Sequence, residues 1–261
     1  MKMKNHIEKI KHEDSRSSSN EHTITIEHLY KKFGENVVLD DFSLTVKKQE
    51  NVVVLGKSGA GKSVLIKCII GLLKPDNGNI FVFGDNIPEL SHIELDLARS
   101  KMGFLFQSNA MYDSMTVREN LEFPLRRHWF KISQKEVDTL VMEALENVNL
   151  SHTVDMMPSE LSGGMQKRVA LARTMILKPE IILYDEPTTG LDPVTARDID
   201  NLILELQKKY QTSSIIISHD MNCVKNTADR VVLLLDGKCY TEGTYEALEQ
   251  SNDEKIKQFF E

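Results

Sequence analysis

A glycine-rich run in the first quarter of the chain has the composition of a phosphate-binding loop. It fits the pattern G-x-x-x-x-G-K-[ST] and follows a short apolar stretch. The glycines allow backbone N–H groups to converge on phosphate oxygens, and the next helix adds its positive N-terminal end. We expect Lys62 to reach the β- and γ-phosphates of a nucleotide, and the Ser63 hydroxyl to ligate Mg²⁺. The predicted cradle comprises Gly56, Lys57, Ser58, Gly59, Ala60, Gly61, Lys62 and Ser63.

Two adjacent carboxylates end another apolar run, Ile181 to Tyr184, further along the chain. Asp185 is expected to hold Mg²⁺ through its water shell, and Glu186 to polarise an attacking water. This assignment favours nucleotide hydrolysis over switch-like or kinase chemistry. An acidic pair at a strand end also commonly caps the next element, so its weight comes from its combination with the phosphate loop.

A second anion site is predicted at Ser162, Gly163 and Gly164, which stand before a helix-like segment, residues 167–176. One chain would not normally aim both anion sites at one nucleotide. The economical arrangement is a head-to-tail dimer of two copies. Each nucleotide then lies between the loop of one copy and the Ser-Gly-Gly segment of the other.

The elements that must position these residues alternate between strands and helices. Three short apolar runs predict strands buried on both faces, and amphipathic segments between them predict helices. This alternation predicts an α/β fold with a largely parallel sheet, preceded by antiparallel strands. The predicted buried strands are Asn51–Leu55, Ile181–Tyr184 and Ser214–Ile217, the antiparallel strands are Thr23–Ile26 and Val37–Val46, and the helices include Ser63–Leu73 and one capped by Ser133 and Glu136. A hairpin with a tight turn is predicted over residues 231–241.

The composition of the 261 residues is that of a soluble globular protein, with 41% apolar and 27% charged residues. A net charge of −7 argues against a broad nucleic-acid-binding surface, so no nucleic acid is expected among the partners. The three cysteines form no CxxC pair and are expected to be reduced thiols. No apolar run approaches the ~20 residues that a membrane helix needs, and no signal peptide is recognisable. Any work at a membrane is therefore expected from the cytoplasmic side, through a partner. Residues 1–22 are polar and serine-rich, which predicts a disordered tail before a single domain at 23–261.

The order and spacing of these motifs resemble the ABC ATPase family over roughly residues 23–245. The resemblance implies ATP and Mg²⁺ as cofactors. It also implies a P-loop NTPase fold with an antiparallel β subdomain and a helical subdomain at about residues 108–175. It identifies Phe33 with the aromatic residue that stacks on adenine, and Asp192 with the aspartate that links two active sites. Gln107 matches a glutamine that senses Mg²⁺ and the γ-phosphate, and His219 matches a histidine that contacts the γ-phosphate. The implied catalytic set is Glu186, His219, Lys62 and Gln107, and the implied metal ligands are Ser63, Gln107 and Asp185.

A finer resemblance concerns residues 61–76, 106–126 and 157–160, which look like the ATPases of Mla/Mce-type lipid transport systems. That resemblance implies phospholipid transport between bacterial membranes, with a transmembrane permease and an Mce-domain lipid-binding subunit as partners. It places the chain on the cytoplasmic face of the inner membrane. A long C-terminal tail that some members carry is not seen after Glu261. Two departures from the wider family are Met165, where glutamine is usual, and Gln49, where glycine is common.

Several alternatives stay open at this point. A small-solute importer, such as one for polar amino acids, would share the same chemistry. A non-transport ABC protein and a scaffold without turnover belong to other classes. The aromatic and methionine positions of residues 108–130 are either core or part of a groove that receives a permease helix. These positions are Met111, Tyr112, Phe123, Trp129 and Phe130.

Overall fold

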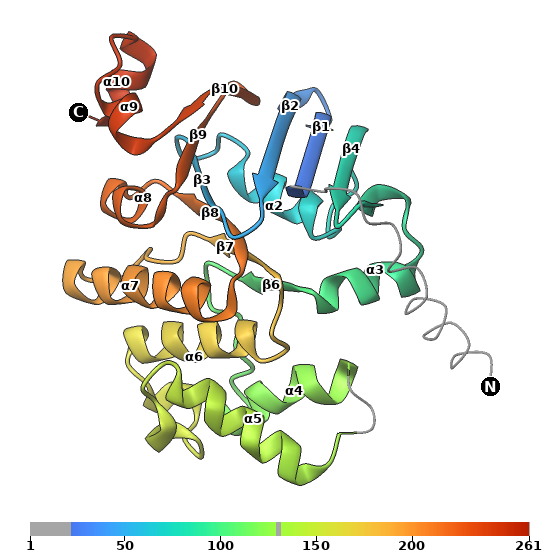
Figure 1. Ribbon diagram of the computed structural model, residues 1–261, viewed down its shortest axis with the longest axis vertical. Coiled ribbons are helices and arrows are strands. Elements are labelled where there is room, and N and C mark those ends of the chain that lie inside the picture. The colour runs from blue at the N-terminus through green and yellow to red at the C-terminus, as the bar shows by residue number, and fades with distance from the viewer. Residues whose placement is uncertain (1–21, 129–131, 261) are drawn as a thin grey trace.

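The computed structural model describes residues 22–128 and 132–260, and its centre is a six-stranded sheet in the order β10-β9-β3-β8-β7-β6 (Figure 1). The predicted parallel sheet is confirmed, because β6, β7, β8, β3 and β9 all pair in parallel and only β10 is antiparallel. The strands are β3 (Asn51–Leu55), β6 (Met102–Leu105), β7 (Ile181–Asp185), β8 (Ser213–Ser218), β9 (Arg230–Leu235) and β10 (Lys238–Gly243). The predicted hairpin is β9–β10, turning at Asp236 and Gly237.

The central strand β3 is buried along its whole length, as its continuous apolar run predicts. Its side chains alternate between two hydrophobic clusters, one on each face of the sheet. Val53 and Leu55 belong to the cluster that includes α4 to α8, while Val52 and Val54 belong to the cluster that includes α2. The loop that follows β3 is therefore held at the edge of two packed layers.

A second, four-stranded sheet in the order β2-β1-β4-β5 packs beside the first. It is antiparallel throughout, which confirms the predicted early antiparallel strands. Its strands are β1 (His22–Phe33), β2 (Asn36–Lys47), β4 (Asn77–Val82) and β5 (Asp85–Asn86). This sheet brings the end of β1 and the start of β2 close to the phosphate loop, because Val38 packs against Gly61.

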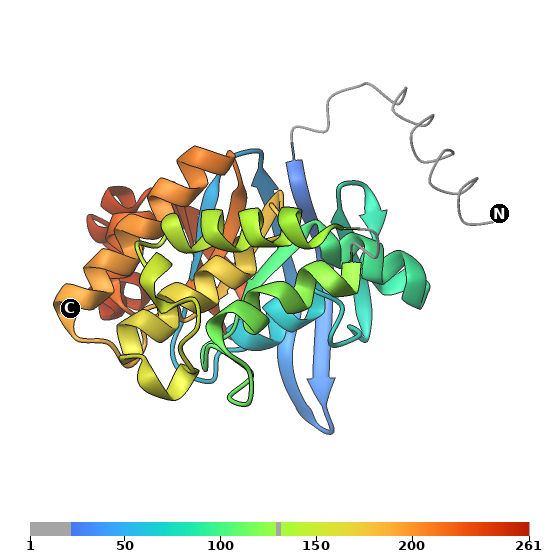
Figure 2. The same ribbon diagram turned by 90° about the horizontal axis from the view of Figure 1, so that it is seen from below.

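The helices cover both faces of the central sheet, with α4, α5 and α6 forming a separate layer at the lower end of Figure 1, also seen in Figure 2. Their bounds are α2 (Lys62–Ile69), α3 (His92–Ser100), α4 (Val117–His128), α5 (Gln134–Glu146), α6 (Gly163–Met175), α7 (Pro193–Tyr210), α8 (Met221–Thr227), α9 (Tyr245–Glu249) and α10 (Glu254–Phe260). Short 3₁₀ turns cover Ile87–Glu89, Ser151–Thr153 and Pro158–Glu160. Among the helices of the described residues, none has both the length and the apolarity to cross a membrane.

Helix α2 ends earlier than the predicted Leu73, so that boundary was wrong. Gly71 has φ +71°, and its N–H donates to the Cys68 carbonyl while Leu72 N–H donates to the Lys67 carbonyl. These two hydrogen bonds are those of a Schellman motif, which ends a helix at a residue with left-handed backbone angles. Glycine adopts these angles without a steric cost. By contrast, the capping box predicted for α5 is confirmed, since Ser133 and Glu136 exchange both bonds.

Two predictions fall on residues outside the described ranges. The tail predicted for residues 1–22 lies there except for His22, which begins β1. Trp129 and Phe130 also lie outside the described residues. The predicted boundary of a helical subdomain at about 108–175 stays a prediction, although α4, α5 and α6 all fall within it.

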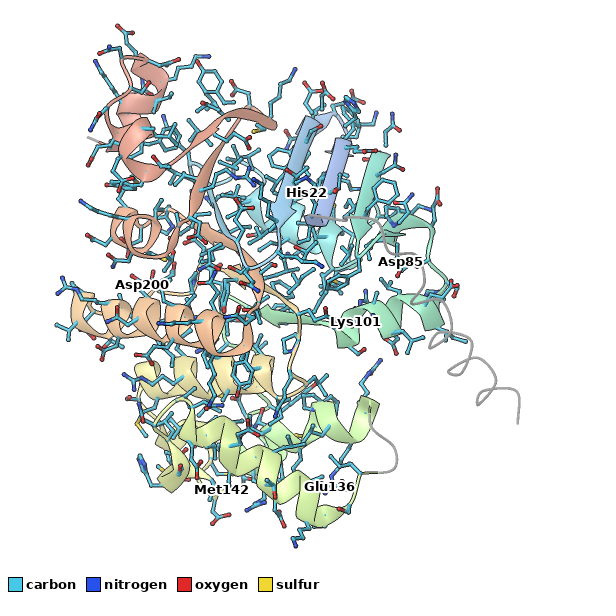
Figure 3. The ribbon with its side chains drawn as sticks, in the orientation of Figure 1. His22, Asp85, Lys101, Glu136, Met142 and Asp200 are labelled. Carbon is cyan, nitrogen blue, oxygen red and sulfur yellow. The ribbon has the colours of Figure 1, made fainter. Side chains whose placement is uncertain are left out.

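A buried carboxylate joins α7 to α8. Asp200 is 1% exposed, and it lies on the side of α7 that faces α8 (Figure 3). Asn226 donates to its Oδ2 over 3.1 Å, while its Oδ1 has no hydrogen-bond partner among the described residues. Burial raises the pKa of Asp200, and the nearby Asp220 adds to the rise, whereas contacts from Cys223 and Asn226 oppose it.

We expect Asp200→Asn to stabilise the fold at neutral pH. Because the folded pKa is raised, Asp200 favours folding only when protonated. That contribution is present below the ordinary pKa of an aspartate and is lost as the pH rises through the raised folded pKa. The midpoint of thermal unfolding should rise by about 2–4 °C at neutral pH, and the gain should shrink toward pH ~4. Glu205→Gln, at an exposed position of the same helix, is the control. It should leave the midpoint of thermal unfolding unchanged both at neutral pH and at pH ~4. A lower midpoint for Asp200→Asn at neutral pH would contradict this account.

Candidate functional site

The phosphate loop joins β3 to α2, in the strand–loop–helix context that its motif requires. Gly61 has φ +100° at the N-cap of α2, and a Cβ there would lie 2.8 Å from Val38 Cγ1. Only glycine fits this position, which lies at the edge of a cavity of about 460 Å³. The cavity is lined by Phe33, Val38, Ser58, Gly59, Gly61, Lys62, Ser63, Val64, Gln107, Glu186 and His219.

The Lys62 ammonium lies inside this loop. It donates to the carbonyl oxygens of Gly56 and Lys57, over 2.7 and 3.1 Å, and its Nζ lies 3.8 Å from Glu186 Oε1. Burial lowers the pKa of Lys62, while the carboxylates of Glu186 and Asp185 oppose that shift. The Lys62 side chain is thus buried while its ammonium lies beside the cavity, where a positive charge can attract phosphate oxygens.

Ser63 and Asp185 come together although they are far apart in sequence. The Ser63 hydroxyl donates to Asp185 Oδ1 over 3.0 Å. Burial raises the pKa of Asp185, the neighbouring Glu186 carboxylate adds to the rise, and the Ser63 hydroxyl opposes it. A hydroxyl and a carboxylate are oxygen donors of the kind that Mg²⁺ requires. Ser63 and Gln107 line the cavity, and Asp185 lies behind Ser63 without lining it. The donor set therefore fits a hard divalent cation shared with phosphate oxygens.

Glu186 is fixed by its own backbone and by neighbouring side chains. Its φ is +52°, in the left-handed region that few non-glycine residues adopt. His219 Nδ1 lies 2.8 Å from Glu186 Oε2, and the Thr189 hydroxyl donates to the same oxygen over 3.2 Å. Glu186 is 8% exposed, and both it and His219 line the cavity. This geometry presents the Glu186 carboxylate to the cavity, beside the Lys62 ammonium.

Five of the eight residues predicted to form the phosphate cradle line the cavity: Ser58, Gly59, Gly61, Lys62 and Ser63. Gly56, Lys57 and Ala60 do not line the cavity, although they belong to the same loop. The Lys57 side chain points to α10, where its Nζ donates to Gln258 Oε1 over 3.3 Å and lies 5.8 Å from the centre of the Phe259 ring. Lys62 is therefore the loop lysine that faces the cavity.

A separate pocket of about 400 Å³ gathers the residues of the predicted second anion site. Ser162 caps α6 by accepting from Met165 N–H, and Asp192 caps α7 by accepting from the N–H groups of Val194 and Thr195. This signature pocket is lined by Ser162, Gly163, Gly164, Met165, Arg168, Gly190, Leu191, Asp192, Thr195 and Asp198. It shares no lining residue with the cavity at the phosphate loop, which we call the nucleotide cavity, so Asp192 and the Ser-Gly-Gly segment line a different pocket from Lys62 and Glu186.

Three residues that support the site were not predicted from the sequence. Thr189 supports Glu186, while Lys167 and Arg173 of α6 donate to backbone carbonyls in the segment that begins at Gln107. The available signal was a lysine among apolar residues of a helix, which is rarely buried without a partner. Lys167 is 2% exposed, and burial lowers its pKa to about 8 although Asp185 opposes the shift.

Part of the segment at 108–130 is exposed rather than core. Tyr112 and Phe123 are 42% and 38% exposed, and their ring centres lie 4.9 Å apart. Ile93 and Leu97 of α3 are exposed as well, and Arg127 of α4 forms an ion pair with Asp96 of α3 over 3.2 Å. Met111 instead packs against the core. We call the exposed apolar residues Ile93, Leu97, Tyr112 and Phe123 the apolar patch.

Two relatives of this chain have names that refer to different cargoes, phospholipid and ribonucleotide. An intermembrane phospholipid transport system ATP-binding protein, MlaF of Haemophilus influenzae, is 40% identical over 92% of this chain and 90% of its own length. The probable ribonucleotide transport ATP-binding protein mkl of Mycobacterium tuberculosis is 38% identical over 91% of this chain and 66% of its own length.

The structural comparison agrees on the fold. The dimeric post-hydrolysis structure of the ATP-binding cassette MJ0796 with ADP and Pi gives a TM-score of 0.77 at 31% identity, covering 85% of this chain and 98% of that chain. Residues 39–189 match the sequence profile of the ABC transporter family. The chain therefore belongs to the ABC transporter family, as one of its ATP-hydrolysing subunits.

Proposed function

We propose that this chain binds ATP with Mg²⁺ in the cavity of the phosphate loop and hydrolyses it with Glu186 as general base. The convergence of Glu186, His219 and Lys62 on one cavity carries this proposal. Bound Mg²⁺ would neutralise charge on the β- and γ-phosphates, held by Ser63, Asp185 and Gln107. Lys62 binds the same phosphates, and Glu186 takes the proton of the attacking water. His219 orients the Glu186 carboxylate and contacts the γ-phosphate.

The active unit we propose is a head-to-tail pair of two copies. The nucleotide cavity and the signature pocket share no lining residue within one chain, which supports a second copy supplying Ser162-Gly163-Gly164. Backbone N–H groups at the start of α6 would then face the γ-phosphate bound by the partner. The related ATP-binding cassette MJ0796 is a dimer in its solved structure, which supports the same arrangement.

The cargo we propose is phospholipid, moved through a transmembrane permease with an Mce-domain lipid-binding subunit. The name of the MlaF relative and the likeness of the segment around Gln107 support this proposal. The chain would then sit on the cytoplasmic face of the inner membrane, bound to the permease. A ribonucleotide cargo is the second candidate, since the mkl relative is almost equally similar.

The deciding experiment is purification of the intact complex from membranes, with identification of its permease and its bound small molecules. Recovery of an Mce-domain protein and phospholipid would support lipid transport. Bound ribonucleotides other than the ATP-site nucleotide, or a periplasmic binding protein for a small solute, would overturn it. Phosphate release by the same complex, compared with a Glu186→Gln complex, tests the hydrolysis itself.

We propose that the permease binds at the apolar patch. Truncating Phe123 to Ala should lower recovery of the permease by about tenfold or more, since a buried interface aromatic commonly contributes ~2 kcal/mol. Tyr240→Ala is the matched control, because Tyr240 is an equally exposed aromatic at 39% on β10, outside the patch. Equal recovery of the permease with both variants would exclude Phe123 from the interface.

A further inference from the structure

The backbone of the segment that follows β6 is held by a buried lysine of α6. The Lys167 ammonium donates to the carbonyl oxygen of Gln107 over 3.1 Å. Lys167 is 2% exposed, so this carbonyl is a partner for a charge that is shielded from water. Gln107 itself lines the nucleotide cavity, and its main chain is therefore fixed by a helix that lies outside the phosphate loop.

A second cation of the same helix holds the next residues. Arg173 donates to the carbonyl oxygens of Asn109 and Ala110, over 2.8 and 2.9 Å. Both of those residues have left-handed backbones, with φ +63° and +47°. Such conformations cost free energy in non-glycine residues and persist where surrounding contacts fix them. The guanidinium supplies those contacts with a rigid, bidentate geometry.

The far end of the segment is closed by α4. Asn120, which is fully buried, donates to the carbonyls of Tyr112 and Met115 and accepts from Tyr112 N–H. Arg173 also donates to Asn120 Oδ1 over 3.3 Å. The segment 107–115 is thus anchored at both ends to helices of the layer that carries the signature pocket.

We propose that Lys167 and Arg173 are positioning residues that fix the backbone of residues 107–110 to α6 and so set the place of Gln107 in the nucleotide cavity. The proposal rests on the proposed function, in which Gln107 meets Mg²⁺. Because α6 begins at Gly163, directly after Ser162, the same helix carries the anion site that the partner copy would use. In the proposed dimer, α6 therefore connects two ATP sites. It holds Gln107 beside the Mg²⁺ of one site, and its first turn belongs to the Ser-Gly-Gly segment that contacts the ATP of the other site.

The first test is hydrogen–deuterium exchange of the nucleotide-free chain carrying Lys167→Met. Methionine keeps the length and the apolar stem of the buried lysine but cannot donate to Gln107, and replacing a buried charge by an apolar group is often tolerated. Amides of residues 107–112 should exchange at least about tenfold faster, while those of β7 and the centre of α6 stay unchanged. Arg173→Met should extend the change to residue 115.

The control is Lys178→Met, which removes an ammonium just after α6. Lys178 pairs with Glu143 over 3.1 Å, without any hydrogen bond to residues 107–115. Its exchange pattern in residues 107–112 should equal that of the unsubstituted chain. Unchanged exchange there in Lys167→Met as well, with the chain folded, would overturn the anchoring.

The second test measures Mn²⁺ binding with ATP by electron paramagnetic resonance, using Lys167→Met in a Glu186→Gln background that does not turn over. A misplaced Gln107 should raise the Kd for Mn²⁺ by about tenfold, the usual loss when a group that orients a metal ligand is removed. Loss of a positive charge near Asp185 would alone lower that Kd, so the two explanations predict opposite signs. A Kd equal to or below that of Glu186→Gln alone would overturn the positioning role.

The two tests separate this inference from the proposed function. If the unsubstituted chain bound no ATP and no Mn²⁺, the proposed function would fail, while the exchange experiment would still decide whether Lys167 anchors the segment. If the unsubstituted chain bound both and Lys167→Met changed neither exchange nor Mn²⁺ affinity, the positioning role alone would be wrong.

Discussion

Replacing Glu186 with Gln is expected to lower the rate of ATP hydrolysis by at least about a hundredfold while ATP still binds. An amide has nearly the shape of the carboxylate and keeps a partner for His219 and for the Thr189 hydroxyl. It cannot accept a proton from water, so only the chemical step is removed. Lys62 and Ser63, which line the same cavity, are unchanged.

The Glu186→Gln chain should therefore accumulate in an ATP-bound state. Size-exclusion chromatography with saturating MgATP should show a dimer, and phosphate release should fall to background. Glu205→Gln, which removes an exposed carboxylate of α7, is the control and should keep the original rate. Hydrolysis above a tenth of the original rate would exclude Glu186 as the general base, and a chain that stayed monomeric would count against the shared-site dimer.

Replacing Lys62 with Ala is expected to weaken ATP binding by roughly 10- to 150-fold, because hydrogen bonds to a charged group contribute about 1.5–3 kcal/mol each. The Lys62 ammonium is the cation that the loop encloses, next to Glu186 at 3.8 Å. Its removal leaves backbone N–H groups and the helix N-terminus to hold the phosphates. Equilibrium titration with a fluorescent ATP analogue measures the change in Kd.

The matched control is Lys57→Ala, in the same loop. The Lys57 side chain is directed to Gln258 and Phe259 of α10 instead of the cavity. Its loss should change the Kd for ATP by no more than about threefold, the scale of a surface charge interaction. Equal losses for the two lysines would mean that the loop acts only through its total positive charge, and the specific role of Lys62 would be wrong.

Much of the fold was readable because its signals are local. The apolar runs at β3, β7 and β8 are short and continuous, so burial on both faces follows from the sequence alone. The phosphate loop and the Ser-Gly-Gly segment need particular residue types next to one another, which is why their patterns are informative. The end of α2 was misplaced because Leu72 and Leu73 continue the apolar pattern after Gly71 has already turned the chain.

The rest of the site depends on contacts between distant residues, which periodicity does not reveal. The loop motif specifies Lys62 but leaves position 57 free, so the direction of the Lys57 side chain, which follows from the position of α10, could not be predicted. Lys167 reads as a polar position of a helix, and its partner lies 60 residues away. The exposure of Tyr112 and Phe123 depends on how α4 packs, which their own sequence does not specify.

Strand β3 gives the two hydrophobic clusters a common wall. Val53 and Leu55 pack in one cluster, and Val52 and Val54 pack in the other. Unfolding of β3 would therefore expose both clusters to water at the same time. The helical layer and the antiparallel sheet are therefore coupled in unfolding, even though they lie at opposite ends of the molecule (Figure 1). A nucleotide that binds the loop after β3 would stabilise both at once, by mass action on the folded state as a whole. Bound ATP would thus raise the free energy of unfolding of the helical layer and of the antiparallel sheet, although it contacts neither layer as a whole.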